Sequence, residues 1–196
     1  MRQAPAVRIA QTEHGKLTRI VGTVEALGEP ATVLTAPFTQ RPCVYYLSTV
    51  SIAAGRNGWR EVAREDRAQD FKLRDESGVA YVVLGGASID VAQDFHDTSG
   101  AFEAPNDTQR EFLAKHRLAP TTTILEVNNS YSYRECVLEI GARVTVLGDV
   151  RHEPCDDNEG LDAPGQYRAS AKKLRVMIVA PAGAKVAVSD SSSLTR

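Results

Sequence analysis

The chain has 196 residues, with 23 Lys and Arg against 25 Asp and Glu, and a formal net charge of −2. This length fits one domain or two small ones, and such a chain buries enough apolar surface to fold without disulfides or a structural metal. The charge balance excludes a protein that is basic over its whole surface, as many binders of nucleic acids and anionic membranes are, but it allows a local basic patch.

The three cysteines exclude a disulfide framework, because one is always left over, and they fit a reducing compartment best. No stretch reaches the ~18 apolar residues of a membrane-spanning helix, and no signal peptide opens the chain. The excess of arginine over lysine and the abundance of alanine suggest a bacterial gene rich in G and C. A cytoplasmic protein or domain is therefore expected.

The first half of the chain consists of short runs rich in Ile, Val, Leu and Thr, separated by turn residues. Gly22 inside the first run predicts a bulge or bend. The turn Gly55-Arg56-Asn57-Gly58 and the turn at 75–78 each predict a hairpin between the runs on either side. The predicted strands are 17–27, 32–34, 43–53, 59–63, 71–73, 79–84 and 88–91.

A single helix is predicted in the second half, near residues 107–118, after a polar and irregular stretch at 93–106. Asp107 can cap its N-terminus, and Pro120 ends it. Three side chains share its apolar face: Phe112, Leu113 and His116.

The remaining strands are predicted at 131–140 and 143–150, on either side of Gly141, and at 174–180 and 184–189. We expect the last two to form a closing hairpin around Pro181-Ala182-Gly183. Between these pairs, residues 153–165 form a polar, acidic loop, and residues 191–196 form a frayed tail.

Many short strands with frequent turns and one helix predict a mainly β fold, made of one or two small OB- or SH3-like barrels with a single inserted helix near 107–118. We treat residues 1–196 as a single β domain with its core at about 19–150 and its closing hairpin at about 174–189. The stretch 93–130 has the character of an insertion between two halves of a β unit.

Patterns typical of enzymes are weak in this sequence. Gly85-Gly86 follows a strand, but no helix opens after it and the lysine of a phosphate-binding loop is missing. His152 and Cys155 form only one pair of potential zinc ligands, whereas a structural site needs four ligands. Cys43 lies in an apolar run that favours a buried and inert thiol. No catalytic residue, metal ion or cofactor is therefore predicted.

Glu135 is the most unusual charged residue in a predicted strand. In that strand Tyr133, Glu135 and Val137 point to one face. A carboxylate between two such neighbours must either face water or find a hydrogen-bond donor. A buried hydrogen bond that fixes a loop or a strand crossing is the structural interpretation, and a binding role is the functional one.

Aromatic and basic residues gather in three segments: the 56–64 hairpin, the 93–106 loop and the 131–135 strand. We predict that these segments form an exposed binding surface, since aromatic and basic side chains are frequent in binding sites. Its candidate residues are Arg56, Trp59, Arg60, Tyr131, Tyr133 and Glu135.

Three stretches, in their order and spacing, resemble the GIDE domain, also called the BAM ("beside a membrane") domain. The first is Val21-Gly22-Thr23-Val24 followed by residues 34–46, which include Arg41-Pro42-Cys43-Val44-Tyr45-Tyr46. The second is Trp59 with Phe71-Lys72-Leu73-Arg74-Asp75-Glu76-Ser77-Gly78. The third is Tyr133-Arg134-Glu135 followed by residues 141–149. Asp70 stands where a proline or small residue is common in this family.

The resemblance covers about residues 19–150 well, and it implies a domain of membrane proteins, among them a mitochondrial E3 ubiquitin ligase. Ligase activity is not implied here, because it belongs to a separate RING finger with eight Cys and His metal ligands, and this chain has no CxxC pair. The resemblance implies a non-catalytic recognition or stress-signalling module close to a membrane, which flanking segments absent from this chain would hold there. The cytoplasmic side of a bacterial membrane is the expected location.

The expected partner is a protein or a small ligand whose identity the sequence does not give, and nucleic acid is not expected. The first alternative is an OB-type domain that binds single-stranded nucleic acid, which would show salt-sensitive binding. The second is a hydrolase or metal enzyme built on Glu135 or on the His152–Cys155 segment.

Overall fold

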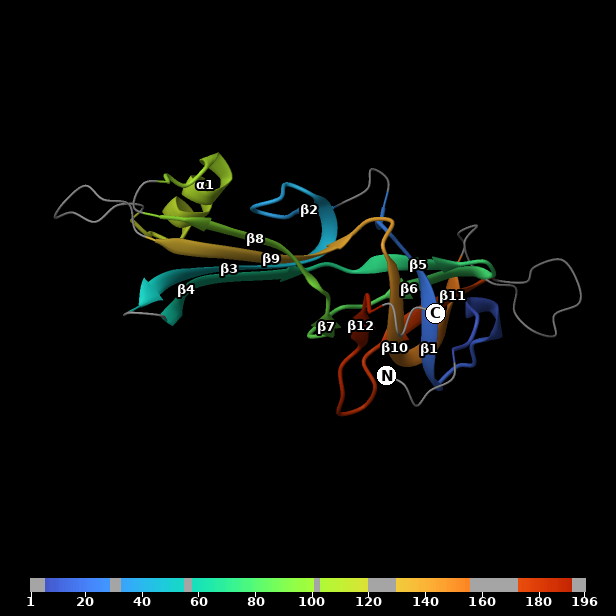
Figure 1. Ribbon diagram of the computed structural model, residues 1–196. Helices are drawn as coiled ribbons and strands as arrows, with labels where there is room; N and C mark the ends of the chain where they lie inside the picture. Colours follow the sequence, from blue (N-terminus) through green and yellow to red (C-terminus); the bar gives the residue numbers. More distant parts are fainter. Residues whose placement is uncertain are drawn as a thin grey trace, which may run out of the picture. The chain divides into compact units, whose positions relative to one another are not determined.

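The computed structural model describes residues 6–28, 33–54, 58–100, 103–119, 130–155 and 173–191 (Figure 1). It contains the short 3-10 helix η1 (Ile9–Gln11) and the α-helix α1 (Asp107–Lys115). The strands are β1 (Leu17–Glu25), β2 (Leu34–Thr35), β3 (Pro42–Ala54), β4 (Gly58–Ala68), β5 (Phe71–Asp75), β6 (Gly78–Val82), β7 (Ser88–Asp90), β8 (Gln93–Ser99), β9 (Tyr131–Glu139), β10 (Arg143–Cys155), β11 (Lys173–Val179) and β12 (Ala187–Ser189).

The chain forms two compact units. The barrel unit comprises Met1–Val33, Gln69–Val91 and Glu139–Arg196. The sheet unit comprises Leu34–Ala68 and Ala92–Leu138, so its two segments interrupt the barrel unit in sequence. The second of these segments contains the predicted insertion at 93–130.

The barrel unit is a closed ring of five strands in the order β1-β5-β6-β11-β10, which the pairing of β10 with β1 completes. The pairing of β6 with β11 is parallel, whereas the other four pairings of the ring are antiparallel. This strand order, with its one parallel pair, is that of an OB-fold barrel. The predicted mainly β fold with a small barrel is confirmed.

Alternating residues of the barrel strands face its core, as a closed sheet requires. In β1, Ile20 and Val24 are fully buried, while the residues between Thr18 and Val24 alternate between buried and partly exposed positions. The pairing of β1 with β10 runs through Gly22 without a shift in register. A Cβ at this position would lie 2.6 Å from the carbonyl oxygen of Arg74, so close approach of β5 explains this glycine, and the predicted bulge is absent.

The predicted closing hairpin is wrong, because β11 and β12 do not pair with each other. β11 pairs with residues 149–155 of β10 and β12 with residues 145–147, both antiparallel. β1 occupies the opposite edge of β10, so β11 and β12 follow one another along the same edge. The segment 153–155, predicted as loop, is the end of β10, while residues 156–165 lie outside the described residues.

The sheet unit contains a five-stranded sheet in the order β2-β3-β9-β8, with β4 also paired to β3. The predicted hairpin of residues 43–53 and 59–63 is confirmed as β3 and β4, which extend farther on both sides. Strand β8 lies in the stretch predicted to be irregular. It pairs with β9 from Gln93 to Ser99, and this pairing gives the polar segment an extended structure that its composition did not indicate.

Helix α1 is confirmed in a shorter form than predicted. Its N-cap is Asn106 rather than Asp107: the Asn106 side chain accepts a hydrogen bond from the Gln109 backbone, and the Gln109 side chain accepts one from the Asn106 backbone. This reciprocal pair is a capping box. The helix ends at Lys115, and Arg117 then takes a left-handed φ of 57°, which stops the helix before Pro120.

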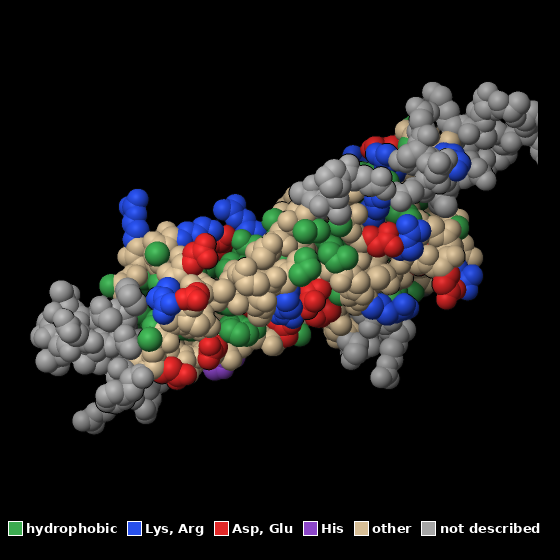
Figure 2. Space-filling view, turned by 90° about the horizontal axis from the view of Figure 1, so that it is seen from above, with side chains coloured by type: hydrophobic (Ala, Val, Ile, Leu, Met, Phe, Trp, Pro, Cys, Tyr) green, Lys and Arg blue, Asp and Glu red, His purple; other side chains and the backbone are tan. Residues whose placement is uncertain are grey.

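Among the described residues, no helix combines the length and the apolar character needed to cross a membrane. Lys and Arg side chains are interspersed with Asp and Glu on the face shown in Figure 2. This mixture agrees with the small net charge of the sequence.

Candidate functional site

Trp59 and Arg60 are exposed at the start of β4, as the sequence predicted. Trp59 pairs across the hairpin with Ala53, and Arg60 pairs with Ile52. The indole has 49% of its surface exposed. Arg56, the third candidate of this hairpin, lies outside the described residues. We call the exposed end of this hairpin the hairpin face: Trp59 and its cross-strand partner Ala53 lie on one side of the sheet, and Arg60 lies on the other.

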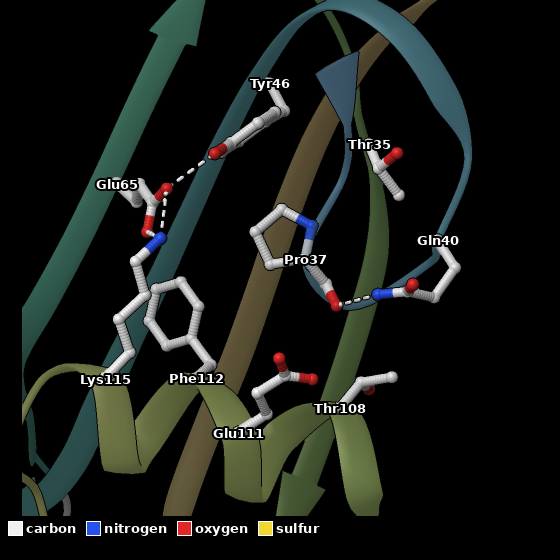
Figure 3. Close-up of a pocket in the computed structure, with 9 residues that line it drawn as sticks. All are labelled: Thr35, Pro37, Gln40, Tyr46, Glu65, Thr108, Glu111, Phe112 and Lys115. Atoms are coloured by element: carbon white, nitrogen blue, oxygen red, sulfur yellow. Dashed lines mark hydrogen bonds and ion pairs between the residues drawn. The ribbon is translucent and has the colours of Figure 1, made fainter. Parts of the chain in front are cut away.

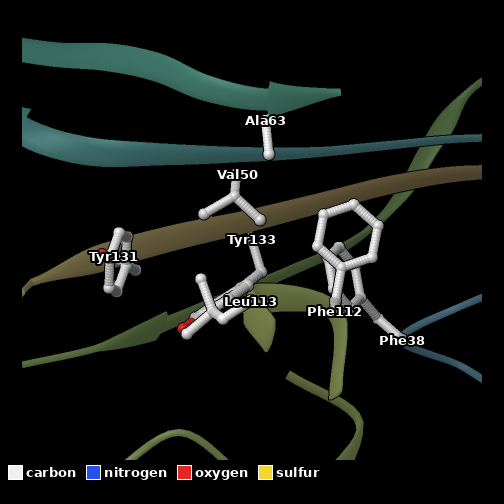
Figure 4. Close-up of a cluster of buried hydrophobic side chains, with 7 residues drawn as sticks. All are labelled: Phe38, Val50, Ala63, Phe112, Leu113, Tyr131 and Tyr133. Carbon is white, nitrogen blue, oxygen red and sulfur yellow. The ribbon is translucent and has the colours of Figure 1, made fainter. Parts of the chain in front are cut away.

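Tyr131 and Tyr133 do not lie on a surface, and the prediction of their exposure is wrong. Both rings belong to the core of the sheet unit, together with Phe38, Val50, Ala63, Phe112 and Leu113 (Figure 4). The Tyr131 hydroxyl donates a hydrogen bond of 2.8 Å to the Ala119 carbonyl. The Tyr133 hydroxyl lies 3.2 Å from the Ser99 hydroxyl. Burial and internal partners make these tyrosines part of the fold.

Glu135 is fully buried and its carboxylate accepts four hydrogen bonds. Oε1 accepts from the Phe38 backbone at 2.9 Å and from the Ser48 hydroxyl at 2.7 Å. Oε2 accepts from the Thr39 backbone at 3.0 Å and from the Thr39 hydroxyl at 2.6 Å. The carboxylate therefore anchors the turn between β2 and β3, and the structural interpretation of this residue is confirmed.

A small pocket of about 240 Å³ opens in the sheet unit between the β2–β3 turn, β4 and α1 (Figure 3). Glu65, Tyr46 and Lys115 gather on one side of it, and Thr35 and Gln40 lie on the other. Pro37, Thr108, Glu111 and Phe112 complete its lining.

Glu65 is the buried charge at this pocket, with 7% of its side chain exposed. The Lys115 ammonium lies 2.7 Å from Oε2, and the Tyr46 hydroxyl donates to Oε1 at 2.6 Å. His116 Nε2 lies 3.4 Å from Oε2. Burial alone would raise the pKa of Glu65, but the hydrogen bonds from Lys115 and Tyr46 outweigh it and bring the pKa to about 2.

The same contact changes the acidity of Tyr46. Burial, followed by its hydrogen bond to the Glu65 carboxylate, raises the pKa of this tyrosine above its usual range. At neutral pH the pocket therefore holds an ionised carboxylate and a neutral phenol, and each satisfies the other. Neither group is suited to proton transfer near pH 7, since an efficient general base has a pKa close to the working pH.

The depressed pKa of Glu65 predicts an acid-sensitive fold. Because the folded-state pKa lies below the unfolded-state value of 4.5, the stabilisation is complete above that pH and is lost as pH falls toward 2. The loss is on the order of 3 kcal/mol. We expect the stability difference between the wild type and Glu65→Gln, measured by urea unfolding, to shrink across this window. A constant difference would contradict the ion pair.

The one pair of potential zinc ligands, His152 and Cys155, lies on β10. In the described part of the chain, no three His, Cys, Asp or Glu side chains lie close enough together to hold a metal ion. His152 contacts the N-terminal segment instead: its backbone N–H donates to His14 Nδ1 at 3.0 Å, and its Nε2 lies 3.3 Å from the Thr12 hydroxyl. Cys155 lies in β10, not in a loop.

The comparisons with known proteins agree with the resemblance found in the sequence. The family model GIDE, described as E3 ubiquitin ligase, matches residues 45–159, which is more than half of the chain. No curated protein and no solved structure matches the chain significantly.

Proposed function

Because the chain belongs to the GIDE family, we propose that it is a non-catalytic recognition module that works beside a membrane and binds a protein partner. Its expected location is the cytoplasmic side of a bacterial membrane, where segments flanking this chain would hold it. The observation that carries the binding proposal is the exposed tryptophan of the hairpin face.

The surroundings of Trp59 favour recognition. Its cross-strand partner is Ala53, and the next pair along the hairpin is Ala54 with Gly58. The small side chain of Ala53 covers little of the half-exposed indole, and Arg60 projects from the other side of the same strand. Tryptophan and arginine are the residue types that most often carry binding energy in protein interfaces.

The buried carboxylates support a role without catalysis. Glu135 is engaged by four donors within the fold, and Glu65 is held ionised by Lys115 and Tyr46. The chain also has only three cysteines and four histidines, fewer than the eight ligands of a RING finger. A ubiquitin-ligase activity of its own is therefore outside the proposal.

The proposal is tested by capture of partners on the tagged chain, from the membrane fraction and from the soluble fraction of the source cells. Trp59→Ala is compared with Leu17→Ala, a matched control that removes a side chain of similar exposure, 53%, from the barrel unit. We expect a partner that is enriched from membranes by the wild type and by Leu17→Ala, and whose capture falls about tenfold with Trp59→Ala. Equal capture by all three chains would contradict binding through the hairpin face, and enrichment only from the soluble fraction would contradict action beside a membrane.

A further inference from the structure

The outer face of the barrel unit carries an aromatic side chain surrounded by basic ones. Tyr81 on β6 pairs with Lys72 on β5 and, in the parallel ladder, with Met177 on β11. The neighbouring residues of these strands that face the barrel core, Leu73, Val82 and Ile178, are buried. Since strand residues alternate between faces, the side chains of Lys72, Tyr81 and Met177 point outward in one row. We define the tyrosine face as Lys72, Arg74, Tyr81, Lys173, Arg175 and Met177.

Two cations of this face contact the tyrosine ring. The guanidinium carbon of Arg175 lies 4.5 Å from the ring centroid, and Lys72 Nζ lies 5.7 Å from it. Both distances fall within the range of cation–π attraction. Because Arg175 lies over the ring, a flat aromatic ligand can stack on the outer side of its planar guanidinium.

The charge of the tyrosine face differs from that of the whole chain. Every charged side chain that β5, β6 and β11 direct outward is basic: Lys72, Arg74, Lys173 and Arg175. Among the described residues, two carboxylates of the flanking strands face this group. Glu25 on β1 binds Arg74, and Glu153 on β10 lies opposite Arg175. A net charge of −2 therefore coexists with a local excess of positive charge.

We propose that the tyrosine face binds single-stranded nucleic acid. Strands β5 and β6 are the second and third strands of the barrel, and this is the face on which OB-fold barrels bind oligonucleotides. After Glu25 and Glu153 offset two of the four positive charges, the basic side chains of these strands still attract phosphates, and Tyr81 with Arg175 offers a stacking surface to one or two bases. An acidic peptide would match the charges, but it would make no use of the ring.

The test is fluorescence anisotropy of labelled dT and rU oligomers of about 16 nucleotides with the full chain, between about 50 mM and 200 mM salt. We expect binding that weakens with salt. Tyr81→Leu should weaken it about tenfold, while Tyr81→Phe, which keeps the ring, should preserve it. Lys72→Gln with Arg175→Gln should lower the slope of log K against log salt by about 1.4. Comparing the two oligomers shows whether RNA or DNA is preferred.

The matched control removes two exposed positive charges elsewhere, by Arg134→Gln with Lys185→Gln, and it should leave binding unchanged after correction for overall charge. Thermal unfolding by circular dichroism confirms that each variant is folded. The proposal is overturned if the wild type does not bind, or if both double variants weaken binding equally. It is also overturned if polyglutamate displaces the oligomer while Tyr81→Leu has no effect on binding. The last result would mean that this face binds any polyanion through its charge, without a contribution from the tyrosine ring. Each outcome is independent of the hairpin face and of its protein partner.

Discussion

Replacing Glu135 with alanine is expected to lower the free energy of unfolding of the sheet unit by about 3–5 kcal/mol. The substitution removes the acceptor of four hydrogen bonds. It leaves the backbone N–H groups of Phe38 and Thr39 and the Ser48 hydroxyl without this partner in the protein interior. The chain has one tryptophan, Trp59 on β4, so urea unfolding followed by its fluorescence reports on this unit.

Glu135→Gln is the control for shape. Its amide keeps one acceptor oxygen but places an NH₂ group against donors, so an intermediate loss of about 1–3 kcal/mol is expected. If Glu135→Ala unfolds at the same urea concentration as the wild type, the carboxylate does not anchor the β2–β3 turn. The binding role predicted for Glu135 would then be favoured over the structural one.

Replacing Tyr133 with alanine is expected to cost a similar amount, about 3–5 kcal/mol, because it opens a cavity in the core of the sheet unit. The ring is fully buried and lies 5.5 Å from the ring of Phe38, centroid to centroid. Thermal unfolding and the Trp59 fluorescence both measure this loss.

Tyr133→Phe separates packing from hydrogen bonding. It keeps the ring and removes only the contact between the Tyr133 and Ser99 hydroxyls, so a loss of about 1 kcal/mol is expected. A stable Tyr133→Ala variant that lost partner binding would restore the predicted binding role of this tyrosine and would contradict its assignment to the core.

The strands that alternate clearly in sequence were predictable. In β1, β5 and β10, buried residues recur at every second position over much of the strand, and most of them are Ile, Val, Leu or Phe. This pattern is sufficient to predict a half-buried strand. The turns at 75–78 and at Gly141 contain residues that favour tight bends. The barrel follows from these elements, because short strands with a single apolar face must close or stack to bury it.

Pairings between distant segments were not predictable in the same way. β8 consists of Gln93-Asp94-Phe95-His96-Asp97-Thr98-Ser99, and it is extended because β9 lies beside it. β11 and β12 are separated by a turn typical of a hairpin, yet both find partners in β10. Such long-range contacts outweigh local preference, and a single sequence does not display them.

The residues of the predicted binding site differ in burial: Trp59 is exposed, whereas Tyr131 and Tyr133 are buried. Trp59 is large and exposed, as the predicted binding surface at the 56–64 hairpin requires. Tyr131 and Tyr133 have hydroxyls that find partners inside the sheet unit, and sequence alone does not distinguish a buried tyrosine from an exposed one.

The pocket at Glu65 was missed for a related reason. Glu65 lies in the highly charged run Arg64-Glu65-Asp66-Arg67, and such a run is typical of a strand exposed to solvent. Its burial depends on Lys115 and Tyr46, which are distant in sequence. Ala63 and Glu65 are buried on either side of the exposed Arg64, so strand alternation was the one sequence feature that could have indicated this burial.

The central claim, that the hairpin face contacts a protein partner, is tested most directly by photo-crosslinking in the source cells. A benzophenone amino acid replaces Trp59 in one chain and Leu17 in another, two positions of similar exposure. We expect a crosslinked adduct of defined mass, in the membrane fraction, from position 59 and none from position 17. No adduct from either position, or the same adduct from both, would contradict the central claim.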